Sequence, residues 1–232
     1  MAAGVAERLH PVVLDVSDHE AVVQRWPEMP QFYAVVNNAG ASLTGAVEKV
    51  SAAEAKALLD VNLVTPAVVA SCVLPSMRAR GSGRIVNVSS IAGLEAIMPF
   101  HAWYHASKFG LEALSDVLRL EVAPFGVKVA LVEPGFFSTS ILAKADEQVR
   151  SQEDPAHPYA AGLARVQQLM GLLDRIAPPP GAVARAIRSA IESSRPKRRY
   201  RVGREALPVR GISLVPDEIT DRVVRLVTNL DG

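Results

Sequence analysis

The stretch Gly83-Arg84-Ile85-Val86-Asn87-Val88-Ser89-Ser90 is a short apolar run that ends in two serines. Its length and its β-branched residues predict a strand that is buried on both faces. Apolar segments of helical length, 51–79 and 103–122, lie on either side of it. A buried strand between two long helices is typical of an α/β protein.

The same alternation of strands and helices continues outward in both directions. Residues 51–54 have the spacing of a capping box, as do residues 17–20, and Pro66 predicts a kink or a break in the helix that contains it. The pattern predicts a Rossmann-like, doubly wound parallel sheet with helices on both faces, and the 232 residues suit a single domain, 1–232. We expect strands at 10–16, 32–36, 83–88, 127–132 and 199–202, and helices at 17–26, 51–79, 103–122, 158–173, 181–194 and 216–230.

Polar or turn residues follow four of the predicted strands. They are Asp15, Asn37, the pair Ser89 and Ser90, and Glu133-Pro134-Gly135. The carboxyl ends of parallel strands meet at one edge of a sheet, and ligands bind beyond that edge in folds of this class. Packing alone does not explain four such endings, so we expect a ligand site there.

Tyr104 and Lys108 are four residues apart at the start of a predicted helix, which places both side chains on one face. A phenol has a pKa near 10, and a neighbouring ammonium favours the phenolate and lowers that pKa. The pair is therefore a candidate general acid and base. Taken alone, the spacing is also typical of a tyrosine and a lysine on a helix surface.

Composition excludes several classes of function. The net charge is +1, which gives no field that would attract nucleic acid. A single cysteine, Cys72, cannot form an internal disulfide, and this favours a reducing, cytoplasmic setting. No apolar run reaches the length of a membrane span, so membrane association is not expected. His101 and His105 form no ligand set with nearby carboxylates, so we expect no metal.

The motifs together resemble those of the short-chain dehydrogenase/reductase family. Asn37-Asn38-Ala39-Gly40, Asp60-Val61-Asn62, the strand 83–90 and Tyr104-His105-Ala106-Ser107-Lys108 match family motifs in order, and Pro134-Gly135 follows with Thr139. The resemblance runs from about residue 11 to about residue 139. It implies an oxidoreductase that interconverts an alcohol and a ketone or aldehyde with NAD or NADP. A sugar epimerase also uses Tyr-x-x-x-Lys, but the sequence around Tyr104 and the short C-terminal part argue against it.

The resemblance implies a role for each catalytic residue. Tyr104 would donate or accept the proton of the substrate oxygen, and Lys108 would lower the pKa of Tyr104 and bind the nicotinamide ribose. Ser90 would hold the substrate oxygen, with Ser89 as the alternative because the spacing to Tyr104 is one residue longer than usual. Asn62 would position a water in a proton relay, and its other reading is a kink residue near Pro66.

The resemblance also implies the cofactor contacts. Asp15 and Val16 would lie at the adenine, although Asp15 could instead be a carboxylate at a helix N-terminus. Asn37, Ala39 and Gly40 would border the adenosine ribose, and Pro134, Gly135 and Thr139 the nicotinamide and diphosphate. Tyr104 and Lys108 complete the set.

One family element is absent from the sequence: the first strand with its T-G-x-x-x-G-x-G turn and helix, whose backbone N–H groups bind the pyrophosphate. Two interpretations compete. Met1 is an internal residue of a longer, active enzyme, or the chain is a truncated, inactive relative that acts as an interaction protein. The choice between NAD and NADP cannot be read, because the family sets it largely in the missing part.

Substrate and partners follow from apolar surfaces. The part from about 135 to 232 would cover the substrate, and the apolar residues of 136–173 favour an apolar alcohol or ketone, although plain helix packing explains them too. Six basic residues in 195–204 are typical of a solvated turn, with contact to an anionic lipid or substrate as the alternative. In the family, helices matching 51–79 and 103–122 form homodimers or homotetramers.

Overall fold

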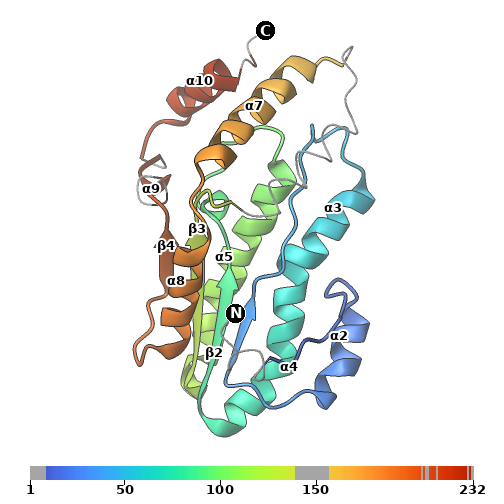
Figure 1. The fold of residues 1–232 in the computed structure, drawn as a ribbon, viewed down its shortest axis with the longest axis vertical. Helices are drawn as coiled ribbons and strands as arrows, with labels where there is room; N and C mark the ends of the chain where they lie inside the picture. The colour runs from blue at the N-terminus through green and yellow to red at the C-terminus, as the bar shows by residue number, and fades with distance from the viewer. Residues whose placement is uncertain are drawn as a thin grey trace.

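A parallel sheet of four strands lies at the centre of the fold (Figure 1). The computed structural model describes residues 9–138, 157–204, 206, 209–212, 214–228 and 230. The strands pair in the order β1-β2-β3-β4, each parallel to its neighbour. Their bounds are β1 (Ala34–Asn37), β2 (Gly83–Val88), β3 (Val127–Pro134) and β4 (Arg199–Val202).

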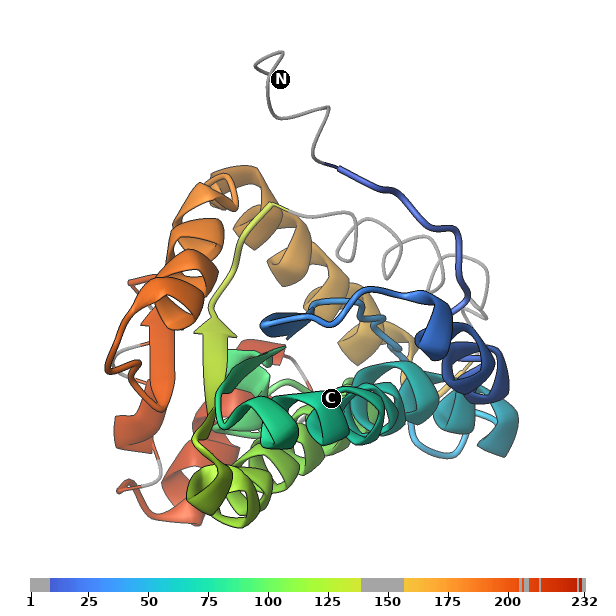
Figure 2. The same cartoon turned by 90° about the horizontal axis from the view of Figure 1, so that it is seen from below.

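Helices cover both faces of this sheet. Figure 2 shows α8 on one side of the strands, with α4 and α5 on the other. This arrangement confirms the prediction of a doubly wound α/β fold. The helices are α2 (His19–Arg25), α3 (Ala52–Leu59), α4 (Thr65–Arg80), α5 (Ala102–Val122), α7 (Ala160–Ile176), α8 (Gly181–Glu192), α9 (Val209–Ile212) and α10 (Asp217–Thr228), with 3-10 turns at Trp26–Glu28, Ile91–Gly93 and Ala123–Phe125.

The two inner strands, β2 and β3, are buried on both faces because their side chains alternate between two cores. Ile85 on β2 packs with Val73 and Met77 of α4 on one face. The next residue, Val86, packs with Val183 of α8 on the other face. Burial of apolar surface contributes about 25 cal/mol per Å² to stability. Because both faces of the sheet are covered, this contribution holds the three layers together. The continuous apolar run of β2 is thus explained by two covered faces.

The long apolar segment after Ser51 forms one irregular helical run. Its start has the predicted capping box, in which Glu54 N–H donates to the Ser51 hydroxyl and the Ser51 N–H donates to the Glu54 carboxylate. Between α3 and α4 the run is π-helical over Asp60–Val64. The predicted irregularity near Pro66 is therefore confirmed, and it precedes the proline.

We expected no segment that could span a membrane, and this expectation is wrong when a segment is judged by its length and composition. Among the described residues, the helical run Ala52–Arg80, 29 residues long, is long and apolar enough to do so. Polar residues such as Asn62 and Thr65 interrupt the run locally, but residues 61–77 carry no charged side chain. About a third of its most apolar window is buried inside the protein.

The N-terminal part differs most from the prediction. Residues 10–16 form no strand, and Val13 is fully exposed. A strand requires a hydrogen-bonding neighbour, and this segment has no partner strand among the described residues, so its apolar run was misleading. Helix α2 is capped by Asp18, whose carboxylate accepts from the Ala21 N–H, and not by the predicted Ser17.

Candidate active site

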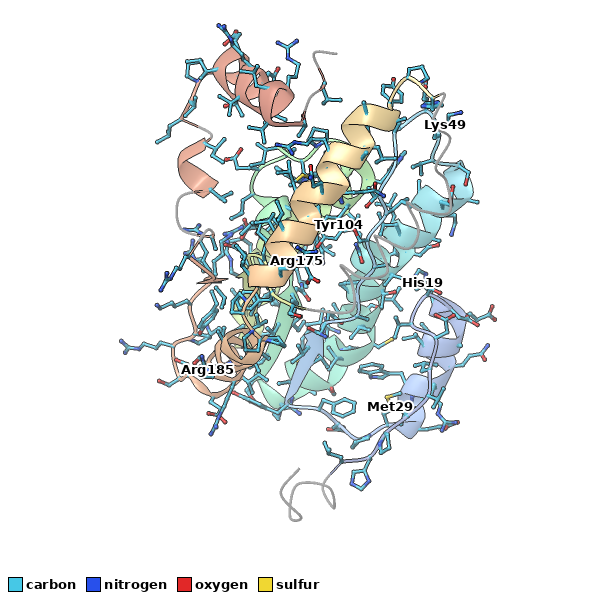
Figure 3. All side chains as sticks on the ribbon, turned by 45° about the horizontal axis from the view of Figure 1, so that its top comes forward. His19, Met29, Lys49, Tyr104, Arg175 and Arg185 are labelled. Atoms are coloured by element: carbon cyan, nitrogen blue, oxygen red, sulfur yellow. The ribbon has the colours of Figure 1, made fainter. Side chains whose placement is uncertain are left out.

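The first turns of α5 carry the tyrosine and lysine that the sequence singled out. The Lys108 ammonium lies 5.8 Å from the centre of the Tyr104 ring and donates a 3.1 Å hydrogen bond to the Val88 carbonyl at the end of β2. Lys108 is 5% exposed. Tyr104 lies near the centre of the molecule in Figure 3, whereas Met29, Lys49 and Arg185 lie at the periphery.

Burial controls the protonation of both side chains. It lowers the pKa of Lys108 to about 8, although the nearby Glu112 carboxylate opposes this shift. It raises the pKa of the Tyr104 phenol, and a hydrogen bond with Ser90 offsets only part of that rise. The expected lowering of the Tyr104 pKa by Lys108 is therefore not found, because desolvation of the phenolate outweighs it. At neutral pH Tyr104 is a phenol that holds its proton.

Of the two serines after β2, it is Ser90 that lies against Tyr104. Its hydroxyl hydrogen-bonds with the Tyr104 side chain and also accepts from the Ala92 N–H at 3.1 Å. Ser89 is buried on the other side, where its hydroxyl lowers the pKa of Glu112. The structure thus places Ser90, and not the alternative Ser89, beside the phenol.

Asn62 connects the π-helical segment to two neighbours. Its amide nitrogen donates to the Ala41 carbonyl at 2.9 Å and to the Ser107 hydroxyl at 3.0 Å, while its oxygen accepts from the Ala41 N–H at 2.9 Å. The side chain is 1% exposed. Because Ser107 precedes Lys108 on α5, Asn62 fixes the loop after β1 against the helix that carries the lysine.

The ends of β1 and β2 are joined by polar side chains. The Asn37 amide donates to the Asn87 oxygen at 2.8 Å, and the Asn87 amide donates to the Ser115 hydroxyl of α5 at 2.8 Å. Asn37 lies opposite Asn87 in the parallel register, so β2 extends one residue beyond the end of β1. The expected meeting of polar residues at the carboxyl edge is confirmed for β1, β2 and β3.

Three of the predicted cofactor residues line one cleft of about 360 Å³ beside β1. They are Val16, Asn37 and Ala39, and the other walls include Val61 and Thr65. Val16 is held there because its carbonyl accepts a 2.7 Å hydrogen bond from the Thr65 hydroxyl.

Gly40 lies between this cleft and the lysine. A Cβ on Gly40 would lie 3.5 Å from the Asn62 oxygen and 3.9 Å from the Lys108 nitrogen. A side chain at this position would therefore lie in contact with the buried ammonium.

The remaining predicted cofactor residues are spread more widely. Asp15 is exposed in its loop, and both the N–H and the hydroxyl of Ser17 donate to its carboxylate and lower its pKa. It does not cap α2, because Asp18 does. Pro134 and Gly135 lie at the end of β3, where the Gly135 N–H donates to the Val202 carbonyl. Thr139 lies outside the described residues.

A buried charge cluster that the sequence reasoning missed lies behind the lysine. Arg199 of β4 donates to Glu112 at 3.1 Å and to Asp116 at 2.7 Å, and pairs with Glu133 at 2.8 Å. Glu133 is fully buried and also accepts from Arg201 at 3.0 Å. The spacing of Lys108 and Glu112 on one helix was a signal for part of this cluster, whereas its contact with Arg199, 87 residues further along the chain, left none.

The residues present fit a nicotinamide dinucleotide at its ribose ends. Lysine carries three donors, and within the described part of the chain the Lys108 ammonium makes one hydrogen bond, to the Val88 carbonyl. Two donors therefore remain for ribose hydroxyl groups, and the backbone of Gly40 lies close to the same nitrogen. No group of three or more His, Cys, Asp or Glu side chains in the described ranges could hold a metal ion.

Comparisons with known proteins agree with this geometry. Residues 2–150 match the family model of short chain dehydrogenase. Human retinol dehydrogenase 5 is 32% identical, over 96% of this chain and 74% of that protein. The 3-ketodihydrosphingosine reductase of Bacteroides thetaiotaomicron is also 32% identical, over 93% of this chain and 80% of its own length.

Solved structures share the fold. A short-chain dehydrogenase from Streptomyces avermitilis superposes with a TM-score of 0.74 at 30% identity, over 99% of this chain and 82% of that one. The chain belongs to the short-chain dehydrogenase family. It is an oxidoreductase with a nicotinamide cofactor, NAD or NADP.

Proposed function

We propose that this protein interconverts an apolar alcohol and its ketone or aldehyde, with Tyr104, Lys108, Ser90 and Asn62 as the catalytic set. The observation that carries the proposal is the contact of three of these side chains around one point. Ser90 hydrogen-bonds with Tyr104, and the Lys108 ammonium lies 5.8 Å from the ring of the same tyrosine. When bound, the nicotinamide would supply or accept the hydride.

Tyr104 acts as the proton donor in the reductive direction. Its raised pKa keeps the phenol protonated at neutral pH, so it can give a proton to a carbonyl oxygen that gains charge. Ser90 donates a second hydrogen bond to that oxygen. The Lys108 ammonium then stabilises the phenolate that remains, and Asn62 supports the return of a proton from solvent through a water.

The cofactor contacts are proposed for both ends of the site. Lys108 and Tyr104 bind the nicotinamide ribose, with Pro134, Gly135 and Thr139 near the nicotinamide and diphosphate. Val16, Asn37, Ala39 and Gly40 border the adenosine, and their shared cleft beside β1 supports this placement. Asp15 is proposed at the adenine because it precedes Val16, which lines the cleft.

An apolar substrate is favoured by the surroundings of α5 and by the relatives. A second cleft of about 730 Å³ borders the first turns of α5 and is lined mainly by apolar residues, among them Ile97, Met98, Phe100, Phe109 and Leu230. Relatives include retinol dehydrogenases and a 17-beta-hydroxysteroid dehydrogenase. Within the segment 136–173, Phe137 belongs to the core and does not support a pocket.

Assembly and location belong to the same proposal. We propose a homodimer or homotetramer through helices 51–79 and 103–122, since Val64, Val117 and Leu120 on these helices are exposed apolar residues. The chain would act as a single domain in the cytoplasm, with 135–232 covering the substrate.

The proposal is tested by titrating the purified chain with NADH and with NADPH and following nicotinamide fluorescence. Turnover is then measured with retinal, with a ketosteroid and with acetoacetate as the polar control. Tyr104→Phe should bind cofactor and lose turnover. Tyr33→Phe is the matched control, because Tyr33 is exposed and outside the site, and it should keep both properties.

Each result decides between the two interpretations of the sequence. Saturable binding with turnover of the apolar carbonyl compounds supports the enzyme and shows which nucleotide is preferred. A folded chain that binds neither nucleotide contradicts the proposal, and favours the alternative of a non-catalytic interaction protein. Turnover that survives Tyr104→Phe would contradict the assigned proton donor.

A further inference from the structure

Glu112 is a buried carboxylate that the proposed reaction does not use. It follows Lys108 by four residues on α5, so both side chains lie on the same face of the helix, and it is 7% exposed. Gly93 lies directly against this turn. A Cβ on Gly93 would lie 2.9 Å from the Lys108 carbonyl oxygen and 3.0 Å from the Glu112 Cγ. Gly93 therefore packs against the backbone of Lys108 and the side chain of Glu112.

Arg199 holds the Glu112 carboxylate in place. The guanidinium donates to Glu112 Oε2 from two nitrogens, at 3.2 and 3.1 Å, and also binds Asp116 and Glu133. The other oxygen, Oε1, is buried near the Ser89 hydroxyl; their interaction lowers the pKa of Glu112 although it falls short of good hydrogen-bond geometry. Arg199 thus fixes one oxygen, and the second remains without a strong partner.

Four cations lie in this cluster: Lys108 and Arg119 on α5, and Arg199 and Arg201 on β4. The anions are Glu112 and Asp116 on α5 and Glu133 on β3. Ionised Glu112 therefore reduces an excess of positive charge, while its burial opposes the ionisation and raises its pKa.

We propose that Glu112 is a positioning residue for Lys108, and that its carboxylate keeps the buried ammonium charged and oriented toward Tyr104 and the cofactor. Arg199 fixes the carboxylate from the β4 side, so the C-terminal strand takes part in preparing the site. The consequence for catalysis rests on the proposed function, whereas the effect on Lys108 itself does not.

The direction of the pKa shifts agrees with this arrangement. Burial lowers the pKa of Lys108 to about 8, and the charge of Glu112 raises it. Burial raises the pKa of Glu112 to about 7, and Glu133 adds to the rise while Arg199 and Ser89 oppose it. Both groups are therefore ionised together between about pH 7 and pH 8.

The test follows the titration of Lys108 by NMR in protein labelled with ¹³C at lysine Cε. The sequence holds six lysines, Lys49, Lys56, Lys108, Lys128, Lys144 and Lys197, so Lys108→Arg assigns the signal. Glu112→Gln should lower the titration midpoint of Lys108 by about one pH unit, the size expected for loss of one close opposite charge. Glu112→Asp, which keeps the charge, should stay nearer to the wild type.

Asp116→Asn is the matched control. Asp116 also binds Arg199 and lies on α5, but it is two turns from Lys108 and more exposed. Its loss should shift the Lys108 midpoint by much less than the loss of Glu112. An unchanged midpoint in Glu112→Gln, or an equal shift in Asp116→Asn, would overturn the proposal.

Titration of Lys108 in the wild-type protein tests the proposal even if the Glu112 variants fail to fold. The Lys108 signal should show a second, smaller inflection near pH 7, because Glu112 takes up its proton there. A single-step curve would also contradict the proposal. These titrations need no cofactor, so a chain without turnover refutes the proposed function and leaves this inference to be decided by the NMR result. In an active chain, the alkaline limb of the kcat profile should move to lower pH in Glu112→Gln.

Discussion

The side-chain amide of Asn62 donates a 3.0 Å hydrogen bond to the hydroxyl of Ser107, the residue before Lys108. The same side chain pairs with both backbone groups of Ala41. One buried amide thus connects the loop after β1, the π-helical segment and the catalytic helix. Its removal should affect the shape of the site and the stability of the fold together.

We expect Asn62→Ala to lower the free energy of unfolding by about 1–3 kcal/mol, because it leaves the half-buried N–H and carbonyl of Ala41 unpaired. Urea denaturation followed by circular dichroism measures the change. Asn38→Ala is the control for stability. Asn38 is exposed in the same loop, so its replacement should change the free energy of unfolding very little. Ordinary surface substitutions change the free energy of unfolding by less than about 0.5 kcal/mol. A loss within that range in Asn62→Ala would show that the hydrogen bonds of Asn62 contribute little.

Gly93→Ala should destabilise the protein by about 1–3 kcal/mol, the usual cost of overpacking. The new methyl group would lie 2.9 Å from the backbone oxygen of Lys108, which cannot move without displacing α5. Gly171→Ala on α7 is the matched control. It meets nothing within 4 Å and should stabilise the helix slightly. Thermal unfolding of both variants separates a steric effect at Gly93 from the general effect of replacing a glycine.

Gly40→Ala should leave the stability nearly unchanged and weaken nucleotide binding. Its Cβ would make only ordinary contacts, at 3.5 Å with Asn62 and 3.9 Å with Lys108, so the folded chain has room for it. The methyl group would nevertheless occupy the space in front of the ammonium where we place the ribose. Unfolding and NADH or NADPH titration on the same sample check this, and unaltered affinity would move the ribose elsewhere.

The stability of the protein should depend on pH through Glu112. Its pKa rises from 4.5 in the unfolded chain to about 7, so the folded state binds this proton more tightly. The contribution of Glu112 to stability is therefore complete below about pH 4.5 and is lost as the pH rises through 7. Buried His101 and His105 have lowered pKa values and act in the opposite direction.

A comparison of wild type with Glu112→Gln isolates this effect. Glutamine carries no proton to lose, so the melting temperature of the variant should rise relative to that of the wild type between pH 4.5 and pH 7. Thermal melts at closely spaced pH values measure the difference. A difference that stays constant, or that falls with pH, would mean that the pKa of Glu112 is not raised.

The sequence predicted most of the sheet because its signals are local. A continuous apolar run predicted β2, and the capping residues Ser51 and Glu54 marked the start of α3 correctly. The segment 10–16 has an equally apolar run and forms no strand, because pairing with a neighbour is not a local property. The predicted cap of α2 was also wrong, because Asp18 and not Ser17 caps this helix.

The site shows the same division between local and distant information. The resemblance of ordered motifs to those of the family brought Tyr104, Lys108, Ser90 and Asn62 to attention, and in the structure they lie around the start of α5. The direction of the Tyr104 pKa was wrong because the sequence does not show how deeply the phenol is buried. The partnership of Glu112 with Arg199 could not be predicted, since it depends on where β4 joins the sheet.

The π-helical segment Asp60–Val64 has a consequence for the whole run from Ala52 to Arg80. Each residue of an α-helix turns the following side chains by about 100°. Deleting one residue here would make the helix regular, but it would rotate one half against the other. Either Asn62 would turn away from Ser107, or the face with Val73 and Met77 would turn away from the sheet. A regular helix could serve the core or the site, and the one additional residue lets a single helix serve both.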